Sequence, residues 1–415
     1  MIEKIITLAI FIACYYFAIT RKFKIAYVSL AAAGLLILLG IVSPGVAFFS
    51  AIKWDVLGIY WGFMMVSMIF AESGMPSLIA HKIIKNVKRE KYVIVALCVL
   101  TASLSAFMEN VGVVLMMAPI AVEVSKKLKT NIFPYMAAIA VSSNIVTTLT
   151  MIADPPALIL AIETGMKFFD FYWFQGRLGL GVITFFGVAA ALLSLLYIFR
   201  KMNKAVRMSD EKVRVDYMPS VIFVGGILAL AVSPYFDVRV GLVGMAVGFV
   251  ALLSGWKNKR KMMTEFDWNS FFFITGIFVV VSSLQVSGLL TDFVGGLGSL
   301  GITNASVMLA IIIWISVAAS SFIDNVPYTV LMIPVCNQLA AMMGVSPYPF
   351  LFGMLIGTGI GGNISPVGAT ANVFACGVIE KHGHKVKLKE YIRISLPFSI
   401  IAVLVCHVLL QFWWM

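Results

Sequence analysis

The chain has 415 residues, of which 61% are hydrophobic and 12% are charged, and its formal net charge is +12. A soluble domain carries about 25% charged residues, so the composition excludes a soluble protein and indicates a polytopic membrane protein. The positive charge does not indicate a nucleic-acid partner, because Lys and Arg occur in short clusters between long apolar runs, the pattern of cytoplasmic loops.

In chain order, the first elements are apolar runs at residues 4–20, 25–42 and 55–73, and a further run at 177–199 closes the first half. Each approaches the ~20 residues that an α-helix needs to cross a bilayer about 30 Å thick. We expect each run to be one transmembrane helix in contact with membrane lipid.

Between these runs, residues 93–125 are too long for one span and too short for two spans with a turn. Lys91 precedes the segment and Lys126 follows it, so both of its ends should lie in the cytoplasm. The segment is therefore predicted to enter the membrane and return as a re-entrant hairpin, with Glu109 and Asn110 at its tip. Irregular backbone at that depth requires cover by protein or a water-filled cavity.

The following segment, 131–165, contains Asp154 directly before Pro155 and Pro156. Proline has no N–H and clashes with the preceding helical turn, so one continuous helix is excluded. We predict two half-helices with a break near Asp154, where freed carbonyls and a helix N-terminus can hold an ion or a polar solute. An ordinary Asp-Pro-Pro turn is the alternative.

The second half of the chain repeats the first. "MENVG" around Glu109 corresponds to "IDNVP" around Asp324, and Pro119 corresponds to Pro334 at the same offset. This predicts two homologous repeats. Their bounds are 1–200 and 216–415, joined by a cytoplasmic basic linker at 201–215, with a second hairpin at about 303–340 and a second broken helix at about 346–378.

The orientation follows from the number of crossings and from the charges. Five crossings in each half invert the second repeat relative to the first. About ten crossings place both termini on the same side of the membrane. We predict that this side is the outside of the plasma membrane, because all basic clusters then face the cytoplasm. The flanks of the second hairpin, 297–306 and 340–349, carry no Lys or Arg, as an outward-opening hairpin requires. The basic clusters begin at residues 21, 81, 126, 200, 257 and 381.

Three carboxylates, Glu109, Asp154 and Asp324, lie in apolar surroundings, where a charged residue costs about 2.5–3.5 kcal/mol on insertion scales. They should then be protonated, paired or bound to a cation. A central ion or substrate site would explain why these carboxylates lie in apolar surroundings. The alternative is that they cap half-helices. The same two interpretations stay open for the nearby amide and hydroxyl side chains. The candidate ion- or substrate-binding residues are Ser105, Glu109, Asn110, Asn144, Asp154, Ser320, Asp324, Asn325, Asn363, Ser365, Thr370 and Asn372. The candidate sodium ligands among them are Glu109, Asn110, Asp324 and Asn325.

Three motifs resemble the ion-transporter superfamily, which includes arsenite-efflux permeases, D-type sodium–proton antiporters, the melanosomal P protein and the citrate and dicarboxylate transporters. They are "IADPPALI" (152–159), "DNVPYTVLMIPV" (324–335) and "GGNISPVGATANV" (361–373), and the resemblance extends over nearly the whole chain. It implies inverted repeats with paired hairpins, alternating access by an elevator-like motion, and commonly a homodimer. It also implies two subsites, formed by the hairpin tips and by the breaks around Asp154 and Thr370.

The hairpin tips differ from the Ser-Asn-Thr of the dicarboxylate branch, since they are Glu-Asn-Val and Asp-Asn-Val here. Acidic side chains disfavour a di- or trianion, so we predict a secondary transporter that exports arsenite or a similar small inorganic solute, coupled to protons or sodium. The alternatives are a sodium–proton antiporter, a di- or tricarboxylate or other anion symporter, and a gated ion channel.

An enzyme is not expected, because no nucleophile–base pair or HExxH motif occurs. No cofactor is expected either, and the five scattered cysteines do not suggest a metal site. The sequence has no nucleotide-binding domain, so any ATPase drive would come from a separate subunit.

Overall fold

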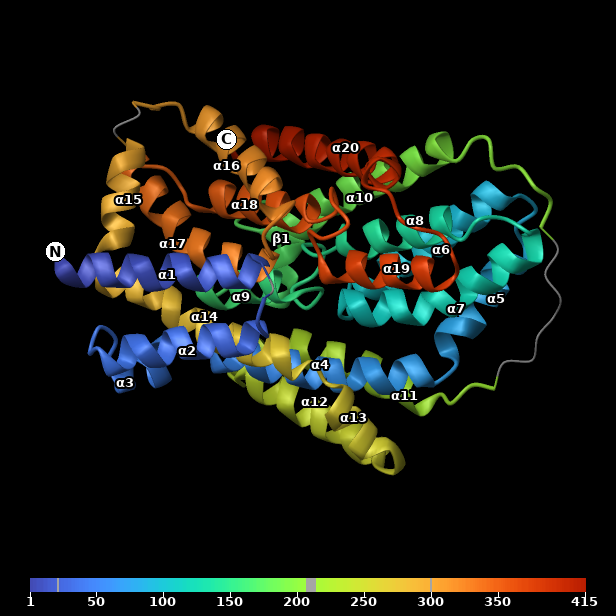
Figure 1. The fold of residues 1–415 in the computed structure, drawn as a ribbon, viewed down its shortest axis with the longest axis horizontal. Coiled ribbons are helices and arrows are strands. Elements are labelled where there is room, and N and C mark those ends of the chain that lie inside the picture. The colour runs from blue at the N-terminus through green and yellow to red at the C-terminus, as the bar shows by residue number, and fades with distance from the viewer. Residues whose placement is uncertain (21, 207–213, 299–300) are drawn as a thin grey trace.

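The computed structural model is almost entirely helical (Figure 1). Two sequence predictions fall partly outside the residues that the structure describes. These are the linker, over residues 207–213, and the basic cluster that begins at residue 21, at that first residue. Within the described part, the named strands are one antiparallel pair, β1 (Trp173–Phe174) and β2 (Arg177–Leu178). The structure describes residues 1–20, 22–206, 214–298 and 301–415.

The first repeat contains a helix at each predicted apolar element. Its elements are α1 (Ile2–Thr20), α2 (Ile25–Leu38), α3 (Pro44–Val46), the π-helix η1 (Ala47–Ala51), α4 (Trp54–Glu72), α5 (Met75–Lys85), α6 (Glu90–Ser105), α7 (Asn110–Leu128), α8 (Phe133–Asn144), α9 (Pro155–Thr164), the 3₁₀ helix η2 (Phe168–Phe171) and α10 (Leu180–Ile198).

The second repeat follows the same order after the linker. Its elements are α11 (Met218–Val232), η3 (Ser233–Phe236), α12 (Val240–Ser254), η4 (Trp256–Asn258), α13 (Lys259–Glu265), α14 (Trp268–Val286), α15 (Leu289–Gly298), α16 (Ala305–Ser320), α17 (Asn325–Met343), α18 (Tyr348–Gly361), α19 (Thr370–Lys381) and α20 (Leu388–Trp414).

Corresponding helices begin at a nearly constant offset along the chain. The pairs α6 and α16, α7 and α17, and α9 and α19 share the offset that separates Glu109 from Asp324, and the pair α4 and α14 departs from it by a single position. The packing is also reciprocal, since α4 packs against α12 while its counterpart α14 packs against α2. We call α6–α7 hairpin 1 and α16–α17 hairpin 2, and residues 145–154 and 362–369 the first and second breaks.

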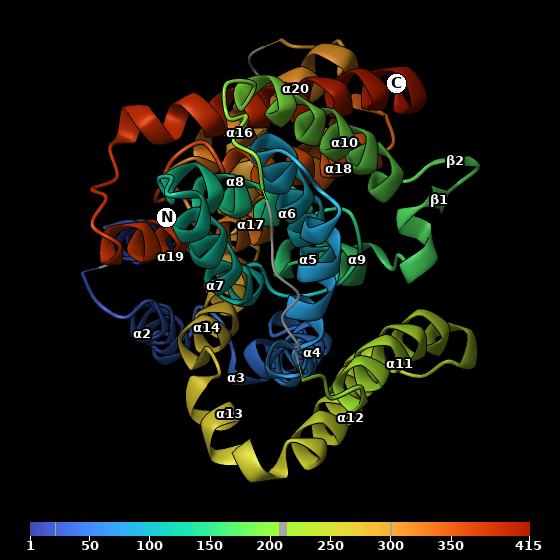
Figure 2. The same cartoon turned by 90° about the vertical axis from the view of Figure 1, so that its right-hand side faces the viewer.

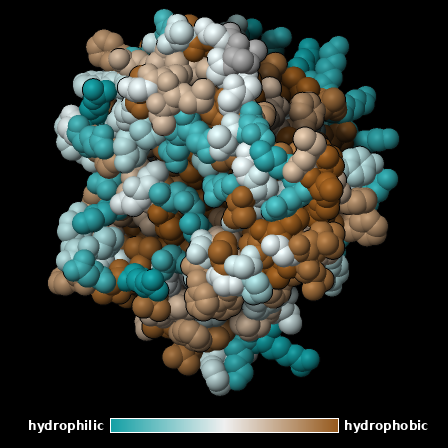
Figure 3. All heavy atoms as spheres, turned by 90° about the vertical axis from the view of Figure 1, so that its left-hand side faces the viewer, coloured by the Kyte–Doolittle hydropathy of each residue, from teal (hydrophilic) through white to brown (hydrophobic). Residues whose placement is uncertain are grey.

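The two hairpins lie in opposite halves of the molecule. In Figure 1, hairpin 1 occupies the right half and hairpin 2 the left half, and both approach the middle. Hydrophilic side chains are spread among hydrophobic ones over the end of the molecule nearest α15, as expected for a face in contact with water (Figure 3). Among the described residues, seven helices are long and apolar enough to cross a membrane, and shorter apolar helices accompany them. The predicted all-α polytopic fold class is therefore confirmed.

The helices form two groups when the molecule is viewed along its long axis (Figure 2). One group contains α2, α4 and α11 to α14, and the other contains both hairpins with α8 to α10 and α18 to α20. In the first group, glycines let α4 and α12 touch through their backbones: a Cβ added to Gly62 would overlap the carbonyl oxygen of Gly244. Such close packing of small residues is typical of membrane helices.

The first break ends at the two prolines. Pro155 and Pro156 are the first residues of α9 and do not lie within the unwound segment, which precedes them. A proline at the first helical position loses no hydrogen bond, because its N–H would be unpaired there in any case. The prolines therefore mark where the second half-helix starts, and other contacts hold the break open.

Candidate functional site

The acidic residue at each hairpin tip caps the second helix of its hairpin. The Glu109 carboxylate accepts a hydrogen bond from the backbone N–H of Gly112 at 2.8 Å, at the start of α7. The Asp324 carboxylate accepts from the N–H of Val326 at 3.1 Å, at the start of α17. Both carboxylates thus lie at the positive end of a helix dipole, which stabilises negative charge.

Asp154 connects the two repeats. It occupies the N-cap position of α9 with extended backbone, but in the described part of the chain its side chain makes no capping bond. Its carboxylate instead accepts a hydrogen bond of 2.7 Å from the side-chain amide of Asn325, at the tip of hairpin 2. The first break is therefore joined to the hairpin of the opposite repeat, a contact that sequence spacing alone does not predict.

Glu109 and Asp154 also line a common cavity of about 30 Å³ together with Tyr60 of α4. This volume suits about one water molecule or a small ion. The remaining lining is apolar and includes Phe63 and Leu158. The cavity thus places two carboxylates beside a small space whose other lining residues are mostly apolar.

Hydroxyl groups fasten each break to the tip of its own hairpin. Thr150 donates a hydrogen bond to the carbonyl of Ala106 in the first repeat. Ser365 donates to the carbonyl of Ser321 at 2.6 Å in the second. The two bonds occupy corresponding positions in the repeats, because the donors and the acceptors are separated by the same offset as Glu109 and Asp324. These contacts, together with the bond between Asp154 and hairpin 2, account for the stable unwound segments.

Three predicted site residues bond to one another. The Asn144 amide donates to the side-chain oxygens of Asn363 at 3.0 Å and Asn372 at 2.9 Å. Asn363 in turn donates to the Val141 carbonyl at 3.0 Å, and Asn372 donates to the carbonyls of Gly362 and Ser365 at 2.9 Å each. We call Asn144, Asn363 and Asn372 the asparagine cluster. It joins α8 to the second break, and its contacts fit the interpretation of buried structural bonding.

The hydroxyl and amide groups near the tips are used unequally. Ser320 donates to the Thr358 carbonyl at 2.6 Å. Its counterpart Ser105 is fully buried, and the Ser105 hydroxyl has no hydrogen-bond partner among the described residues. Asn110 is 6% exposed, and its side-chain oxygen also has no hydrogen-bond partner among them. Thr370 is partly buried at the first position of α19.

The structure thus brings Glu109, Asp154 and Asn325 together and gathers the three asparagines into a separate cluster. Sequence analysis missed Tyr60 and Thr150. Thr150 could have been found, because it is the position of the first repeat that corresponds to the predicted Ser365. Tyr60 gave no signal, since a single tyrosine in an apolar helix has no distinguishing pattern.

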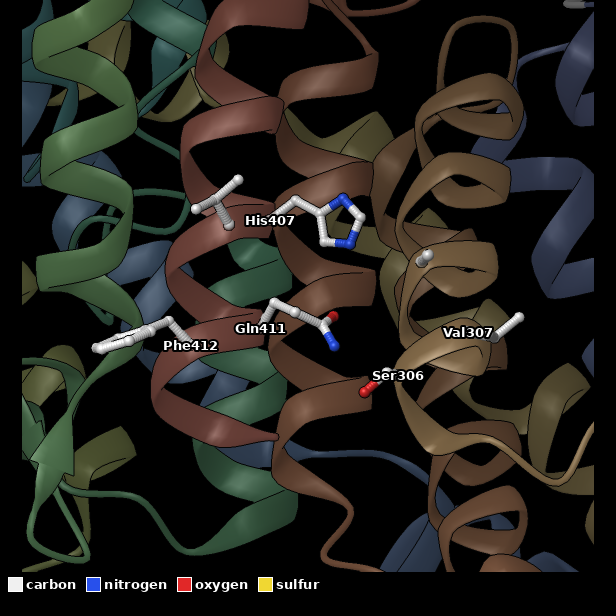
Figure 4. A pocket seen from close by; sticks show the side chains of 7 residues that line it. Ser306, Val307, His407, Gln411 and Phe412 are labelled. Carbon is white, nitrogen blue, oxygen red and sulfur yellow. The ribbon is translucent and has the colours of Figure 1, made fainter.

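A larger groove lies elsewhere and is not the candidate site. Its volume is about 640 Å³, between α16 and α20, and Figure 4 shows Ser306 and Gln411 facing each other across it with His407 further along α20. The described residues that line it include none of the predicted site residues, and exposed apolar side chains such as Val408 and Phe412 border it. Over residues 1–20, 22–206, 214–298 and 301–415 there is no group of three or more His, Cys, Asp or Glu that could hold a metal ion.

Opposed helical hairpins, broken helices and carboxylates between them define a membrane transporter. The chain belongs to the CitMHS citrate transporter family, whose model matches residues 15–357. This finding confirms the predicted resemblance, and both the family and its relatives are named as transporters and not as enzymes.

Individual relatives and one solved structure agree with this assignment. An uncharacterized transporter of Mycobacterium tuberculosis is 27% identical over 401 residues, which cover 94% of each chain. The human P protein is 23% identical over 448 residues, 86% of this chain and 53% of that protein. The crystal structure of the YdaH transporter of Alcanivorax borkumensis has the same fold, with a TM-score of 0.56, 14% identity and coverage of 91% of this chain and 87% of that one.

Proposed function

We propose that this transporter exports arsenite or a similar small inorganic solute, coupled to a flux of protons or sodium. The observation that carries the proposal is the cavity of about 30 Å³ lined by Glu109 and Asp154. The cavity is small, so a solute larger than a water molecule would require the side chains that line it to move apart. Its carboxylates are strong hydrogen-bond acceptors, so they favour a neutral donor or a cation over an anion.

Uncharged As(OH)₃ fits this chemistry through its three hydroxyl groups. These can donate to carboxylate oxygens, which Glu109 and Asp154 supply at the cavity. Thiol coordination is not part of the proposal, because the described residues that line the cavity include no cysteine. Four of the five cysteines, including Cys98 and Cys336, are buried.

Sodium–proton antiport is the second candidate. The unpartnered oxygens of Ser105 and Asn110 at the tip of hairpin 1, so identified among the described residues, are suitable hard ligands for sodium. A carboxylate near them, Glu109, could balance its charge. The same groups would serve sodium as the coupling ion in arsenite transport.

Transport of citrate or another di- or tricarboxylate, as the family name suggests, is the third candidate. A trianion would have to enter a site where the Asp154 carboxyl group lies within electrostatic range of both Glu109 and Asp324. Like charges at short range repel, and burial strengthens the repulsion. We therefore consider an anion symporter less well supported than the first two candidates. The same ranking applies to a gated channel.

The test is transport by purified protein in proteoliposomes with an imposed pH or sodium gradient. Arsenite accumulation that follows the gradient and shows counterflow would support the proposal. Sodium movement with no other solute would favour the antiporter, gradient-driven citrate uptake would favour the anion symporter, and current without exchange would favour a channel.

The rest of the proposal concerns the setting of the protein. It includes a plasma-membrane location with both termini outside, a homodimer, and a transport cycle that needs no cofactor. A separate ATPase subunit would be an accessory to arsenite export. Cross-linking in native membranes and co-purification with such a subunit test these two partners.

A further inference from the structure

The groove between α16 and α20 combines polar and apolar side chains. Its volume of about 640 Å³ falls in the range of roughly 300–1,000 Å³ that ligand pockets occupy. Ser306 and Gln411 face each other across it, and His407 lies further along α20 (Figure 4). Ala310 and Val408 add apolar surface to its lining. A ligand that fills the groove therefore needs both an apolar body and polar atoms.

The polar side chains of the groove have unused hydrogen-bonding groups. In the described part of the chain, neither the Gln411 amide nor the His407 imidazole makes a hydrogen bond. The backbone N–H of Ser306 donates to the Asn304 side chain at 2.9 Å, but the Ser306 hydroxyl makes no bond within the described chain. An amide, a hydroxyl and a neutral imidazole can each donate a hydrogen. The groove therefore presents several donors to its occupant.

The groove lies on the surface that faces the membrane. α20 is long and apolar enough to cross a bilayer, and α16 is a shorter apolar helix. Val307 and Phe412, at the border of the groove, are 47% and 79% exposed. Ser306 is the second residue of α16, and Gln411 lies three residues before the end of α20. These two donors therefore lie near helix ends, the level at which hydrocarbon gives way to lipid headgroups.

A phospholipid matches this arrangement of donors and apolar surface. Its ester carbonyls accept hydrogen bonds near the level of the helix ends, and its acyl chains supply apolar surface deeper in the bilayer. Donors left without partners beside hydrocarbon would be costly. The described residues that line the groove include no Lys or Arg, so the groove does not select a charged headgroup.

A second copy of the chain fits the groove less well. Membrane helices pack closely where small residues let their backbones approach. The border of this groove instead carries the large, exposed side chains of Val307, Val408 and Phe412. A flexible acyl chain can follow such a surface, whereas a rigid helix is held away from it.

We propose that the groove between α16 and α20 binds one diacyl phospholipid, whose ester carbonyls accept hydrogen bonds from Ser306 and Gln411 and whose acyl chain covers Val408. His407 supplies a further donor about one helical turn away from Gln411 on α20. Since α16 is the first helix of hairpin 2, the bound lipid joins this hairpin to α20. The inference goes beyond the proposed function and holds whichever solute is transported.

The first experiment uses the wild-type, full-length protein in detergent and measures lipid retention by native mass spectrometry. Diester phosphatidylcholine should bind about tenfold more tightly than its diether analogue, because the analogue has the same headgroup and chains but lacks the carbonyl oxygens. Equal retention of the two lipids would overturn the recognition of the ester groups. This comparison needs no substitution, so it does not depend on the folding of a variant.

Two substitutions test the donors. Gln411→Leu and Ser306→Ala should each weaken retention of the diester lipid by about threefold to tenfold, the loss of one hydrogen bond. The matched control is Ser103→Ala, an exposed serine of α6 outside the groove whose hydroxyl donates to the Val99 carbonyl at 2.9 Å. It should leave retention unchanged. Wild-type retention by Gln411→Leu, or an equal loss in Ser103→Ala, would contradict the assignment.

A fluorophore in the groove distinguishes a bound lipid from a general lipid coat and from a second copy. It is attached at Val408→Cys, in a background where the partly buried Cys376 is replaced by Ser. In vesicles, brominated diester lipid should quench it more strongly than brominated diether lipid. At the control position Val224→Cys, 53% exposed on α11, the two lipids should quench equally.

Two results of this last experiment would overturn the proposal. Equal quenching by the two lipids at Val408→Cys would mean that only a nonspecific lipid coat fills the groove. Disulfide-linked dimers of the unlabelled Val408→Cys protein in dilute vesicles would mean that a second copy of the chain occupies it.

Discussion

Replacing Asn144 by alanine tests whether the asparagine cluster is structural or a set of transport ligands. The substitution removes both hydrogens that the Asn144 amide donates to Asn363 and Asn372, whose residues are 0% exposed. If each bond is worth the roughly 0.6 kcal/mol measured between membrane helices, the loss is about 1 kcal/mol. If both oxygens stay desolvated and unpaired at about 1–3 kcal/mol each, it reaches about 2–6 kcal/mol.

The assay is thermal unfolding of detergent-purified protein, followed by size-exclusion chromatography after heating. Asn144→Ala should lower the midpoint clearly. The matched control is Ser142→Ala on the same helix, because the buried Ser142 hydroxyl bonds to no nitrogen or oxygen atom in the described structure and has only the weakly hydrogen-bonding Cys98 thiol beside it, so its removal should cost little. A wild-type midpoint for Asn144→Ala combined with abolished transport would refute the structural interpretation and make Asn144 a ligand.

The remaining predictions concern the tip, the helix packing, the break and the topology. Asp324→Asn should abolish gradient-driven transport in proteoliposomes while leaving folded, membrane-inserted protein; wild-type rates would contradict the role of this carboxylate. Gly62→Val should prevent close packing of α4 on α12 and lower the yield of folded protein by fluorescence-detected chromatography, because the added Cβ would meet the Gly244 carbonyl. Replacing Pro155 and Pro156 together by Ala should leave direct solute binding nearly unchanged, since both begin α9; loss of binding would show that they hold the break open. A single cysteine at Lys204 should react with impermeant reagents only from the cytoplasm, and external labelling would reverse the orientation.

The sequence predicted the order and type of the helices well, for physical reasons that act locally. Apolar length identified α1, α4 and α10 to within about three residues of their bounds. The basic residues that flank α6 and α7 distinguished a hairpin from a single long span. Repetition at a constant offset then extended both results to the second half.

Contacts between the repeats were not predictable in the same way. The Asp154–Asn325 bond and the Asn144–Asn363 bond join residues that are far apart in the chain, so they depend on how the two halves pack. The constant offset relates corresponding positions, but it says nothing about which residues of opposite repeats touch. The short helices α5 and α15 were missed for another reason: each is too short to be recognised as a membrane span.

Some contacts of the described conformation occur in one repeat and have no counterpart in the other. If the protein works by alternating access, inverted repeats of identical sequence would give two states of equal energy, because exchanging the conformations of the two repeats would convert one state into the other. Here Lys53 and Glu163 form an ion pair of 3.0 Å between the start of α4 and the end of α9. The corresponding residues, Asp267 and Val378, cannot form one.

A state in which the two repeats exchanged conformations would therefore lack this ion pair. Both side chains are about one-third exposed (31% each), so the pair contributes only about 0.2–1 kcal/mol by itself. The Asp154–Asn325 bond acts in the same direction, because Ala369 cannot replace Asp154 in the other repeat. Small contacts that occur in only one repeat together favour the described state. A ligand can shift the equilibrium to the other state only if its binding free energy for that state exceeds its binding free energy for the described state by more than the sum of these contributions.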